Sequence, residues 1–341
     1  MKSTAVRKTM RGLPEDLERK RKLGETPMDY LMINLRGGCN YSCPKCFVDC
    51  PPVDRPSLTH QQVSELIRQA ADLGARVVVI AGEGEPLLAP GLHEIIEFDA
   101  KLGLTTVLFT NGSFLGREEA AFLSDNDCSV IISCDSLKSE IYGVLTGTRS
   151  AAAFDRAMLN INEFRNVLRK TVEVSDGLRI VRGAINMTVT LLAEQELSSM
   201  RAFCGDDFLL VCNSVAPQGR ARKALLRLCG SAKDISRLRG IAAKFSETGG
   251  PSATCHDGEC GYLFHGVAIG SEGSILPCAY TQDLGGALGN VSGLSLSKAL
   301  ATANRFKKQC FDRYGCSTCI VRHGHYGRMV ADAQDAPRTT R

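Results

Sequence analysis

Short runs of β-branched and apolar residues alternate with amphipathic helical patterns along most of this chain, and this alternation is the strongest constraint on its fold. A strand, a helix and a second strand form a parallel βαβ unit, and such units close into a barrel or an open sheet. The predicted strands cover 30–35, 76–81, 105–110, 129–134, 179–190 and 208–215. The predicted helices between them cover 59–73, 92–102, 117–123, 154–164 and 194–203.

Six such units predict an α/β fold, a partial (β/α)6 barrel of the TIM type. We expect this barrel over 29–230, after a basic amino-terminal extension over 1–28. Ligands of a parallel barrel gather at the carboxyl ends of its strands, in the loops that lead to the helices. The search for a site therefore begins in those loops.

The pattern changes after the barrel, and a smaller module is predicted there. A bridging helix and a Gly/Pro/Ser-rich linker occupy 231–254, and a polar tail occupies 323–341. Between them, 255–322 predicts a small α+β domain rich in cysteine and glycine. It contains one β-hairpin, 266–278, and a short helix, 296–303.

The chain has 15 cysteines and no apolar signal segment at its amino terminus. In a reducing cytoplasm, so many cysteines indicate metal binding or thiol chemistry rather than disulfides. The net charge of +4 is too small to indicate a nucleic-acid partner, and no apolar run is long enough to cross a bilayer. We therefore expect a cytoplasmic protein that binds neither nucleic acid nor a membrane.

Cys39, Cys43 and Cys46 follow the first predicted strand with C-x3-C-x2-C spacing. Thiolates this close in sequence can bend around one [4Fe–4S] cluster, for which thiolate is the preferred ligand. Three ligands leave one iron open to a further molecule. The alternative is a zinc site completed by Cys50 or a distant histidine, although typical zinc spacings differ.

This cysteine spacing after a first barrel strand resembles the radical S-adenosylmethionine (SAM) superfamily, over about residues 30–220. The resemblance implies that the methionyl amino and carboxylate groups of SAM bind the open iron. It implies further that the reduced cluster cleaves SAM to a 5′-deoxyadenosyl radical, which abstracts hydrogen from a substrate. An electron donor such as flavodoxin or ferredoxin would be a partner.

A segment after the second predicted strand resembles the G-G-E-P segment with which the superfamily holds the methionyl amino group. It reads Gly82, Glu83, Gly84, Glu85 and Pro86, with Glu83 in place of a family glycine. A glycine turn with nearby carboxylates suits an ammonium group. The alternative is that the two glutamates are ordinary loop acids.

Polar residues after the third and fourth predicted strands also resemble superfamily segments, which meet the ribose and carboxylate of SAM. They are Asn111, Ser133 and Asp135, for which turn capping is the alternative. One residue departs from the family pattern. The superfamily often has an aromatic residue directly before the third cysteine, near adenine, and this chain has Lys45, with Phe47 just after the cysteine.

The carboxyl-terminal cysteines resemble the SPASM/twitch-type auxiliary domain of the superfamily, in which a hairpin follows C-x9–15-G-x4-C spacing around Gly273. The resemblance implies a second [4Fe–4S] cluster. Its implied ligands are Cys260, Cys278, Cys316 and Cys319. Cys255 or Cys310 could replace one of these, and two partly ligated clusters or a zinc site are further alternatives.

A fully ligated auxiliary cluster can accept or relay an electron, which fits a net oxidation. We therefore predict a radical SAM oxidoreductase that dehydrogenates or cross-links a natural-product intermediate or a peptide. In the alternative of a radical epimerase, Cys134 or Cys212 at a strand end donates hydrogen; otherwise each is a buried apolar residue. A non-catalytic zinc module is another alternative, and a cyclase like the molybdenum-cofactor enzymes is disfavoured because their Gly-Gly end is absent.

Overall fold

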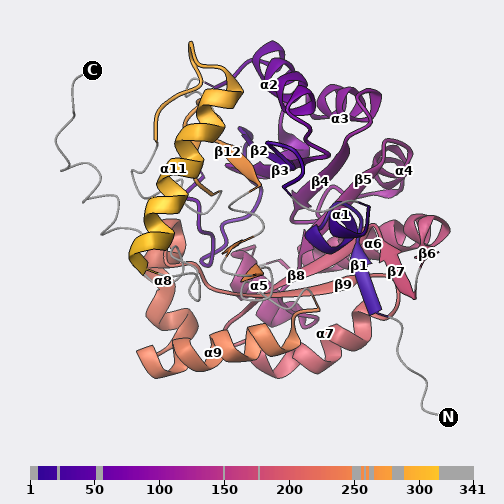
Figure 1. The fold of residues 1–341 in the computed structure, drawn as a ribbon. Helices are drawn as coiled ribbons and strands as arrows, with labels where there is room; N and C mark the ends of the chain where they lie inside the picture. Colours follow the sequence, from indigo (N-terminus) through magenta and orange to yellow (C-terminus); the bar gives the residue numbers. More distant parts are fainter. Residues whose placement is uncertain are drawn as a thin grey trace.

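The computed structural model describes residues 7–20, 24–50, 57–148, 150–175, 177–247, 255–256, 259–260, 265–278 and 288–314 (Figure 1). At its centre lies an eight-stranded sheet with the order β13-β12-β2-β3-β4-β5-β8-β9. From β12 to β9, neighbouring strands run parallel. The six barrel strands are β2 (Tyr30–Leu35), β3 (Val77–Gly82), β4 (Thr105–Thr110), β5 (Cys128–Ser133), β8 (Gly183–Val189) and β9 (Leu209–Ser214).

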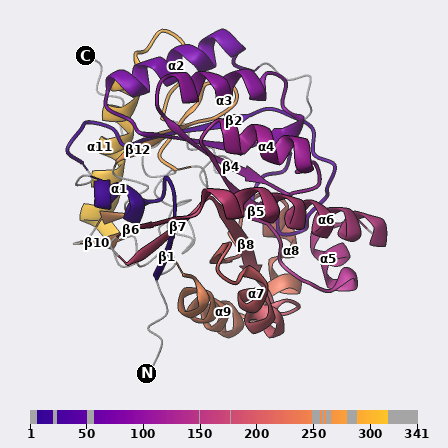
Figure 2. The same cartoon turned by 90° about the vertical axis from the view of Figure 1, so that its right-hand side faces the viewer.

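Helices cover the outer face of this curved sheet (Figures 1 and 2). They are α2 (His60–Asp72), α3 (Leu92–Lys101), α4 (Arg117–Asp125), α5 (Ser139–Thr146), α6 (Ala151–Leu168), α7 (Leu197–Cys204), α8 (Gly219–Cys229) and α9 (Ala232–Phe245). The predicted α/β partial barrel is therefore confirmed. Of the helices it contains, α5 and α8 were not predicted from the sequence.

The helix α2 shows how local sequence sets these boundaries. It begins with a capping box, in which Thr59 accepts a hydrogen bond from the Gln62 backbone and Gln62 accepts one from Thr59. Its buried residues, including Leu66 and Ile67, recur at helical spacing and face the sheet.

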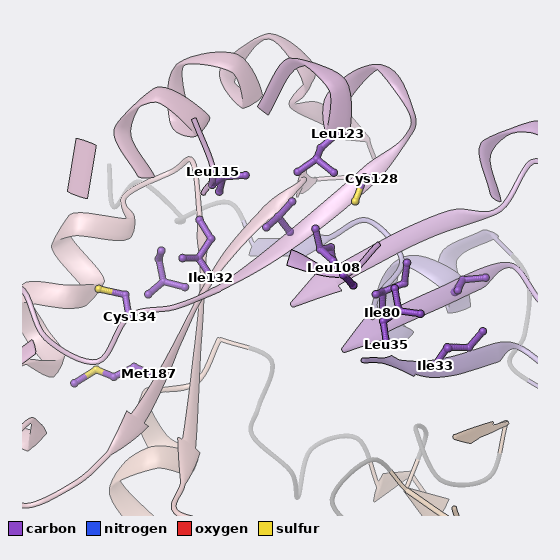
Figure 3. Packing of buried hydrophobic residues seen from close by; sticks show 14 of the residues in the cluster. Ile33, Leu35, Ile80, Leu108, Leu115, Leu123, Cys128, Ile132, Cys134 and Met187 are labelled. Atoms are coloured by element: carbon purple, nitrogen blue, oxygen red, sulfur yellow. The ribbon is translucent and has the colours of Figure 1, made fainter. Parts of the chain in front are cut away.

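Side chains alternate between the two faces of each barrel strand, so the sheet has two apolar cores. The larger core lies between the strands and the outer helices and contains Ile33, Leu35, Ile80, Leu108 and Ile132 (Figure 3). The smaller core fills the barrel lumen near the amino ends of the strands. The carboxyl ends of the strands are left to carry polar groups.

The amino-terminal segment closes the base of the lumen. It forms β1 (Arg7–Met10) and α1 (Pro14–Lys20), and its buried side chains Met10, Leu13 and Leu17 pack in the lumen core. A Cβ at Gly12, where φ is 85°, would lie 2.9 Å from the Val107 side chain. The predicted extension therefore contributes to the barrel core.

The predicted strand 179–190 is two strands in different sheets. β7 (Leu178–Val181) lies between β1 and β6 (Glu173–Ser175) in a three-stranded sheet, whereas β8 lies in the barrel. The chain changes sheet at Arg182 and Gly183. A Cβ at Gly183 would lie 2.6 Å from the Phe208 ring, so a larger residue cannot begin β8 without displacing that ring.

The predicted hairpin belongs to the barrel sheet itself. β12 (Gly266–Ile269) pairs in parallel with β2 and antiparallel with β13 (Ile275–Leu276). α11 (Leu296–Tyr314), longer than the helix predicted, lies beside α2, where the Gln69 side chain accepts a hydrogen bond from the Leu296 backbone at 2.8 Å. None of the helices in the described part of the chain is long and apolar enough to cross a bilayer.

We expect Leu17→Ala to destabilise the protein by about 2–5 kcal/mol, because it leaves a cavity where the segment closes the lumen. Urea denaturation measures this change. The control is Leu226→Ala, at a residue 74% exposed on α8, which we expect to change stability by less than about 0.5 kcal/mol. Equal effects of the two substitutions would contradict a structural role for the segment.

Candidate active site at the carboxyl end of the barrel

The loop after β2, residues 37–50, is called the cysteine loop below. Its Cys39, Cys43 and Cys46 are free, partly exposed thiols. Burial raises the pKa of Cys43 to about 12, against the smaller lowering effect of Lys45, and burial also raises the pKa of Cys39 and Cys46. Thiolates at these positions therefore need a cationic centre to stabilise them, and a bound metal supplies that charge.

The donor set fits an iron–sulfur cluster. Among the described residues, no three His, Cys, Asp or Glu side chains converge on the position of a single metal ion. A [4Fe–4S] cluster holds its thiolates on separate irons, so its ligands need not converge on one point. A Cβ at Gly38, beside Cys39, would meet no atom within 4 Å, so there is open space next to the loop.

Two helices, α5 and α8, hold the cysteine loop in place. The Tyr41 hydroxyl is 3.1 Å from the Tyr142 hydroxyl of α5. The Ser42 backbone donates a hydrogen bond to the carbonyl of Thr146 at 3.0 Å. On the other side, the Ala221 backbone donates to the carbonyl of Cys46, also at 3.0 Å.

The Gly82–Pro86 turn after β3 packs directly on the cysteine loop. A Cβ at Gly84 would lie 2.1 Å from the carbonyl oxygen of Gly37 and 2.7 Å from that of Gly38, so no other residue fits. The Glu85 backbone donates a hydrogen bond to the Gly38 carbonyl at 2.9 Å. The two segments that resemble superfamily motifs are therefore in mutual contact.

The Glu85 carboxylate accepts hydrogen bonds from three protein groups. It accepts hydrogen bonds from the Thr110 hydroxyl at 2.6 Å and from the backbones of Asn111 at 2.7 Å and Leu87 at 3.2 Å. Burial raises its pKa, although these hydrogen bonds oppose the shift. Glu85 therefore fixes the end of β4 against the turn that begins η1 (Pro86–Leu88).

Asn111 is also tied to the protein. Its side-chain nitrogen donates to the Asn40 side chain at 2.9 Å, and its oxygen accepts from the Ser113 backbone at 2.9 Å. This amide connects the loop after β4 to the cysteine loop. Ser133 ends β5 on the lumen side and is partly exposed.

Asp135 forms a buried ion pair with Lys45. The Lys45 ammonium is 2.8 Å from one carboxylate oxygen of Asp135, and the other oxygen accepts a hydrogen bond from the Thr188 backbone at 2.7 Å. Burial alone would lower the pKa of Lys45, but Asp135 and the nearby Cys43 raise it above its usual value. Lys45, which departs from the family pattern, thus pairs with Asp135, which matches a superfamily segment.

Glu83, which replaces a family glycine, is buried in a second charged network. Its carboxylate lies 3.2 Å from the Arg36 guanidinium and accepts hydrogen bonds from the Ser271 backbone at 3.0 Å and hydroxyl at 2.6 Å. Arg36 also donates to the Ser271 hydroxyl at 2.7 Å and pairs with Glu272 at 2.9 Å. The network fastens the turn of the β12–β13 hairpin to the Gly82–Pro86 turn.

Cys134 and Cys212 lie in the outer core, on the face of the sheet turned to the helices. Figure 3 shows Cys134 in this core. Both are at most 1% exposed. The strand alternation explains this: Cys134 is in phase with Ile132, which faces the helices, and Cys212 with Leu210. A hydrogen donor would have to point toward the barrel mouth. The Cys134 and Cys212 side chains point toward the outer helices instead.

The carboxyl-terminal cysteines are described only in part. Cys255 and Cys260 are directly opposite each other in the small β10–β11 ladder (Cys255–His256 and Glu259–Cys260). Cys278 follows β13 and is partly exposed, and Cys310 lies on α11. Cys316 and Cys319 lie outside the described residues.

Sequence reasoning missed Arg36, Thr188, Ser271 and Glu272. Arg36 gave one signal, since it is a lone charge at the end of an apolar run just before the cysteine loop. Its partners are far away in the sequence, and nothing local identifies them.

Residues 33–183 match the Radical SAM superfamily. The fold and this site agree with that match, so residues 33–183 form a domain of the radical SAM class. Enzymes of this superfamily use a [4Fe–4S] cluster and SAM, which agrees with the cofactors predicted from the sequence.

Similar curated proteins include a probable GTP 3′,8-cyclase of Methanothermobacter thermautotrophicus, 31% identical over 35% of this chain and 39% of that protein. An S-adenosylmethionine-dependent nucleotide dehydratase of Flammeovirga pacifica is 31% identical over 36% and 43%. An AdoMet-dependent heme synthase of Methanosarcina barkeri is 29% identical over 38% and 37%. The matches thus span about two fifths of the length of these relatives.

Similar solved structures extend over more of the chain. SuiB of Streptococcus suis, bound to the precursor peptide SuiA, has a TM-score of 0.62 at 18% identity and covers 83% of this chain and 66% of that one. anSMEcpe, with bound AdoMet and a peptide, has a TM-score of 0.53 at 17% identity and covers 91% and 97%. At these identities the likeness concerns the fold.

We expect Gly84→Ala to destabilise the protein by about 1–3 kcal/mol and to lower the iron it binds, because the new methyl group displaces the cysteine loop. Denaturation and iron analysis measure these effects. In the control Gly143→Ala, the methyl group on α5 meets no atom within 4 Å, so we expect unchanged iron. Wild-type iron in both variants would show that the close contact is not needed.

We expect Arg36→Met to destabilise the protein by about 3–5 kcal/mol, because it leaves the buried Glu83 carboxylate without its cation. The control is Arg68→Met, which removes an exposed pair with Glu65 and should change stability by less than about 1 kcal/mol. Urea denaturation compares the two. A similar small effect in both would mean that the network does not hold the hairpin.

Proposed function

We propose that this chain is a radical SAM oxidoreductase that abstracts hydrogen from a C–H bond of a natural-product intermediate or a peptide. One observation carries the proposal. The C-x3-C-x2-C loop and the Gly82–Pro86 turn pack on each other at the carboxyl end of a parallel barrel, where such barrels bind their ligands. When bound, the cluster and SAM supply a carbon radical that can attack an unactivated C–H bond.

The proposed cluster ligands are Cys39, Cys43 and Cys46. The proposed SAM contacts are the Gly82–Pro86 turn, Asn111, Ser133 and Asp135. Because the carboxylates of Glu85 and Asp135 are already hydrogen-bonded, the backbone groups of the turn are the better candidates for contact with the methionyl amino group. Glu83, Glu85 and Asp135 then act by holding the loops around that position.

The proposed auxiliary cluster uses Cys260, Cys278, Cys316 and Cys319, with Cys255 and Cys310 as alternatives. Two features support it: the cross-strand position of Cys255 and Cys260, and the place of Cys278 after a hairpin that joins the sheet beside β2. β2 also leads into the cysteine loop. A fully ligated cluster there could accept an electron removed from a substrate radical, as a net oxidation requires.

The lumen near the strand ends favours a polar, uncharged group on the substrate. The Asn213 side chain donates to the Asn186 side chain at 2.6 Å, and these residues and Ser133 are partly exposed. Arg36 and Lys45 are each already paired with carboxylates. A nucleotide substrate, as in the related probable GTP 3′,8-cyclase, would need cations for its phosphates. SuiB is seen with a precursor peptide. Together these points support a peptide or a neutral small molecule.

We expect anaerobic reconstitution to give about eight irons per chain, and Cys43→Ala/Cys46→Ala to leave about four, because two [4Fe–4S] clusters are proposed. Iron and sulfide analysis measures this. Cys128→Ala is the control, since that thiol is buried in the outer core. About four irons, all lost in the double variant, would remove the auxiliary cluster, and zinc without iron would contradict the proposal.

Formation of 5′-deoxyadenosine from SAM by the reduced protein tests the chemistry directly. The double cysteine variant should show none above background, while Cys128→Ala should match the wild type. Persistent formation in the double variant would mean that another site cleaves SAM.

A further inference from the structure

The Lys45–Asp135 ion pair joins parts of the barrel that are distant in the sheet. Lys45 lies in the cysteine loop after β2, directly before Cys46. Asp135 follows β5, the third strand along from β2, and accepts a hydrogen bond from Thr188 on β8. One lysine side chain therefore fastens the cysteine loop to the opposite part of the barrel mouth.

The pair is shielded from solvent and fixed in direction. The Lys45 side chain is 10% exposed and that of Asp135 is 3% exposed, so water screens their charges weakly. Asp135 is anchored through its second oxygen to the Thr188 backbone, so the carboxylate that the ammonium meets is fixed in place. Lys45 directly precedes Cys46 and is two residues from Cys43 in the chain, and the charges of Cys43, Cys46 and Cys134 interact with this ammonium.

We propose that Lys45 is a positioning residue that holds a fixed positive charge beside Cys43 and Cys46 and so raises the reduction potential of the cluster bound there. Reduction adds one electron, from a low-potential one-electron donor, and makes the cluster more negative. A nearby cation stabilises the reduced form more than the oxidised form. Asp135 limits this effect, because its carboxylate opposes the ammonium.

This inference rests on the proposed cluster at Cys39, Cys43 and Cys46, and the two can fail separately. If the protein binds no iron, the proposed function fails. If iron binds normally and the potential does not respond to the charge at Lys45, only the inference fails. The measurement is the midpoint potential of this cluster in the full-length protein with its auxiliary cysteines unchanged. A redox titration without substrate gives it from the EPR signal of the reduced cluster.

We expect Lys45→Met to disfavour reduction about tenfold, which is about 59 mV for a one-electron couple, and Lys45→Arg to restore it. Asp135→Asn should favour reduction by a similar factor, because the ammonium loses its counter-charge. The double variant Lys45→Met/Asp135→Asn should return toward the wild-type potential. Lys101→Met is the matched control, because that lysine is 73% exposed on α3 and away from the loop.

The opposite signs keep the inference falsifiable. Disruption of the loop would change the potential or the iron content in the same way in both single variants, which would overturn the proposal. A potential in Lys45→Met equal to that in Lys101→Met would also overturn it. If Lys45→Met loses its cluster, Lys45→Arg and Asp135→Asn still test the effect of the charge. A wild-type potential in Lys45→Arg and a raised potential in Asp135→Asn would support the proposal. Any other pair of values would overturn it.

Discussion

The contact between Gly84 and the cysteine loop is the constraint on which the rest of the site depends. The two backbones approach so closely that a Cβ at Gly84 would lie 2.1 Å from the Gly37 carbonyl. Two loops from adjacent parallel strands are thereby held as one layer across the barrel end. The cysteines and the turn after β3 keep their mutual position because no side chain separates them.

Buried polar groups fasten this layer to the remaining elements. Glu85 ties it to β4, the Lys45–Asp135 pair ties it to β5 and β8, and Glu83 ties it to the β12–β13 hairpin. Each carboxylate is matched by donors, as burial requires. Glu83, Glu85 and Asp135 therefore work mainly as anchors of the site.

The sequence alone could predict most of the barrel strands and the cysteine loop, because both depend on local patterns. Strand 30–35 and the C-x3-C-x2-C spacing need no distant partner to be recognised. The sequence could not predict the ion pair of Lys45 or the network of Glu83. Glu83 and Ser271 are 188 residues apart in the chain, and only the closed barrel brings such partners together. The predicted orientation of Cys134 was wrong for another reason. A shift of one residue along a strand moves a side chain to the other face of the sheet.

The hairpin connects the two proposed cluster sites mechanically. β12 pairs with β2 along its whole length, and β2 leads directly into the cysteine loop. The hairpin turn is then held a second time by Glu83 and Arg36, next to that loop. Because metal binding and local folding are coupled when ligands lie on loops, a change in the order of the hairpin should affect the cysteine loop as well. The barrel and the carboxyl-terminal cysteine region therefore share one structural frame, even though their motifs are separate in the sequence.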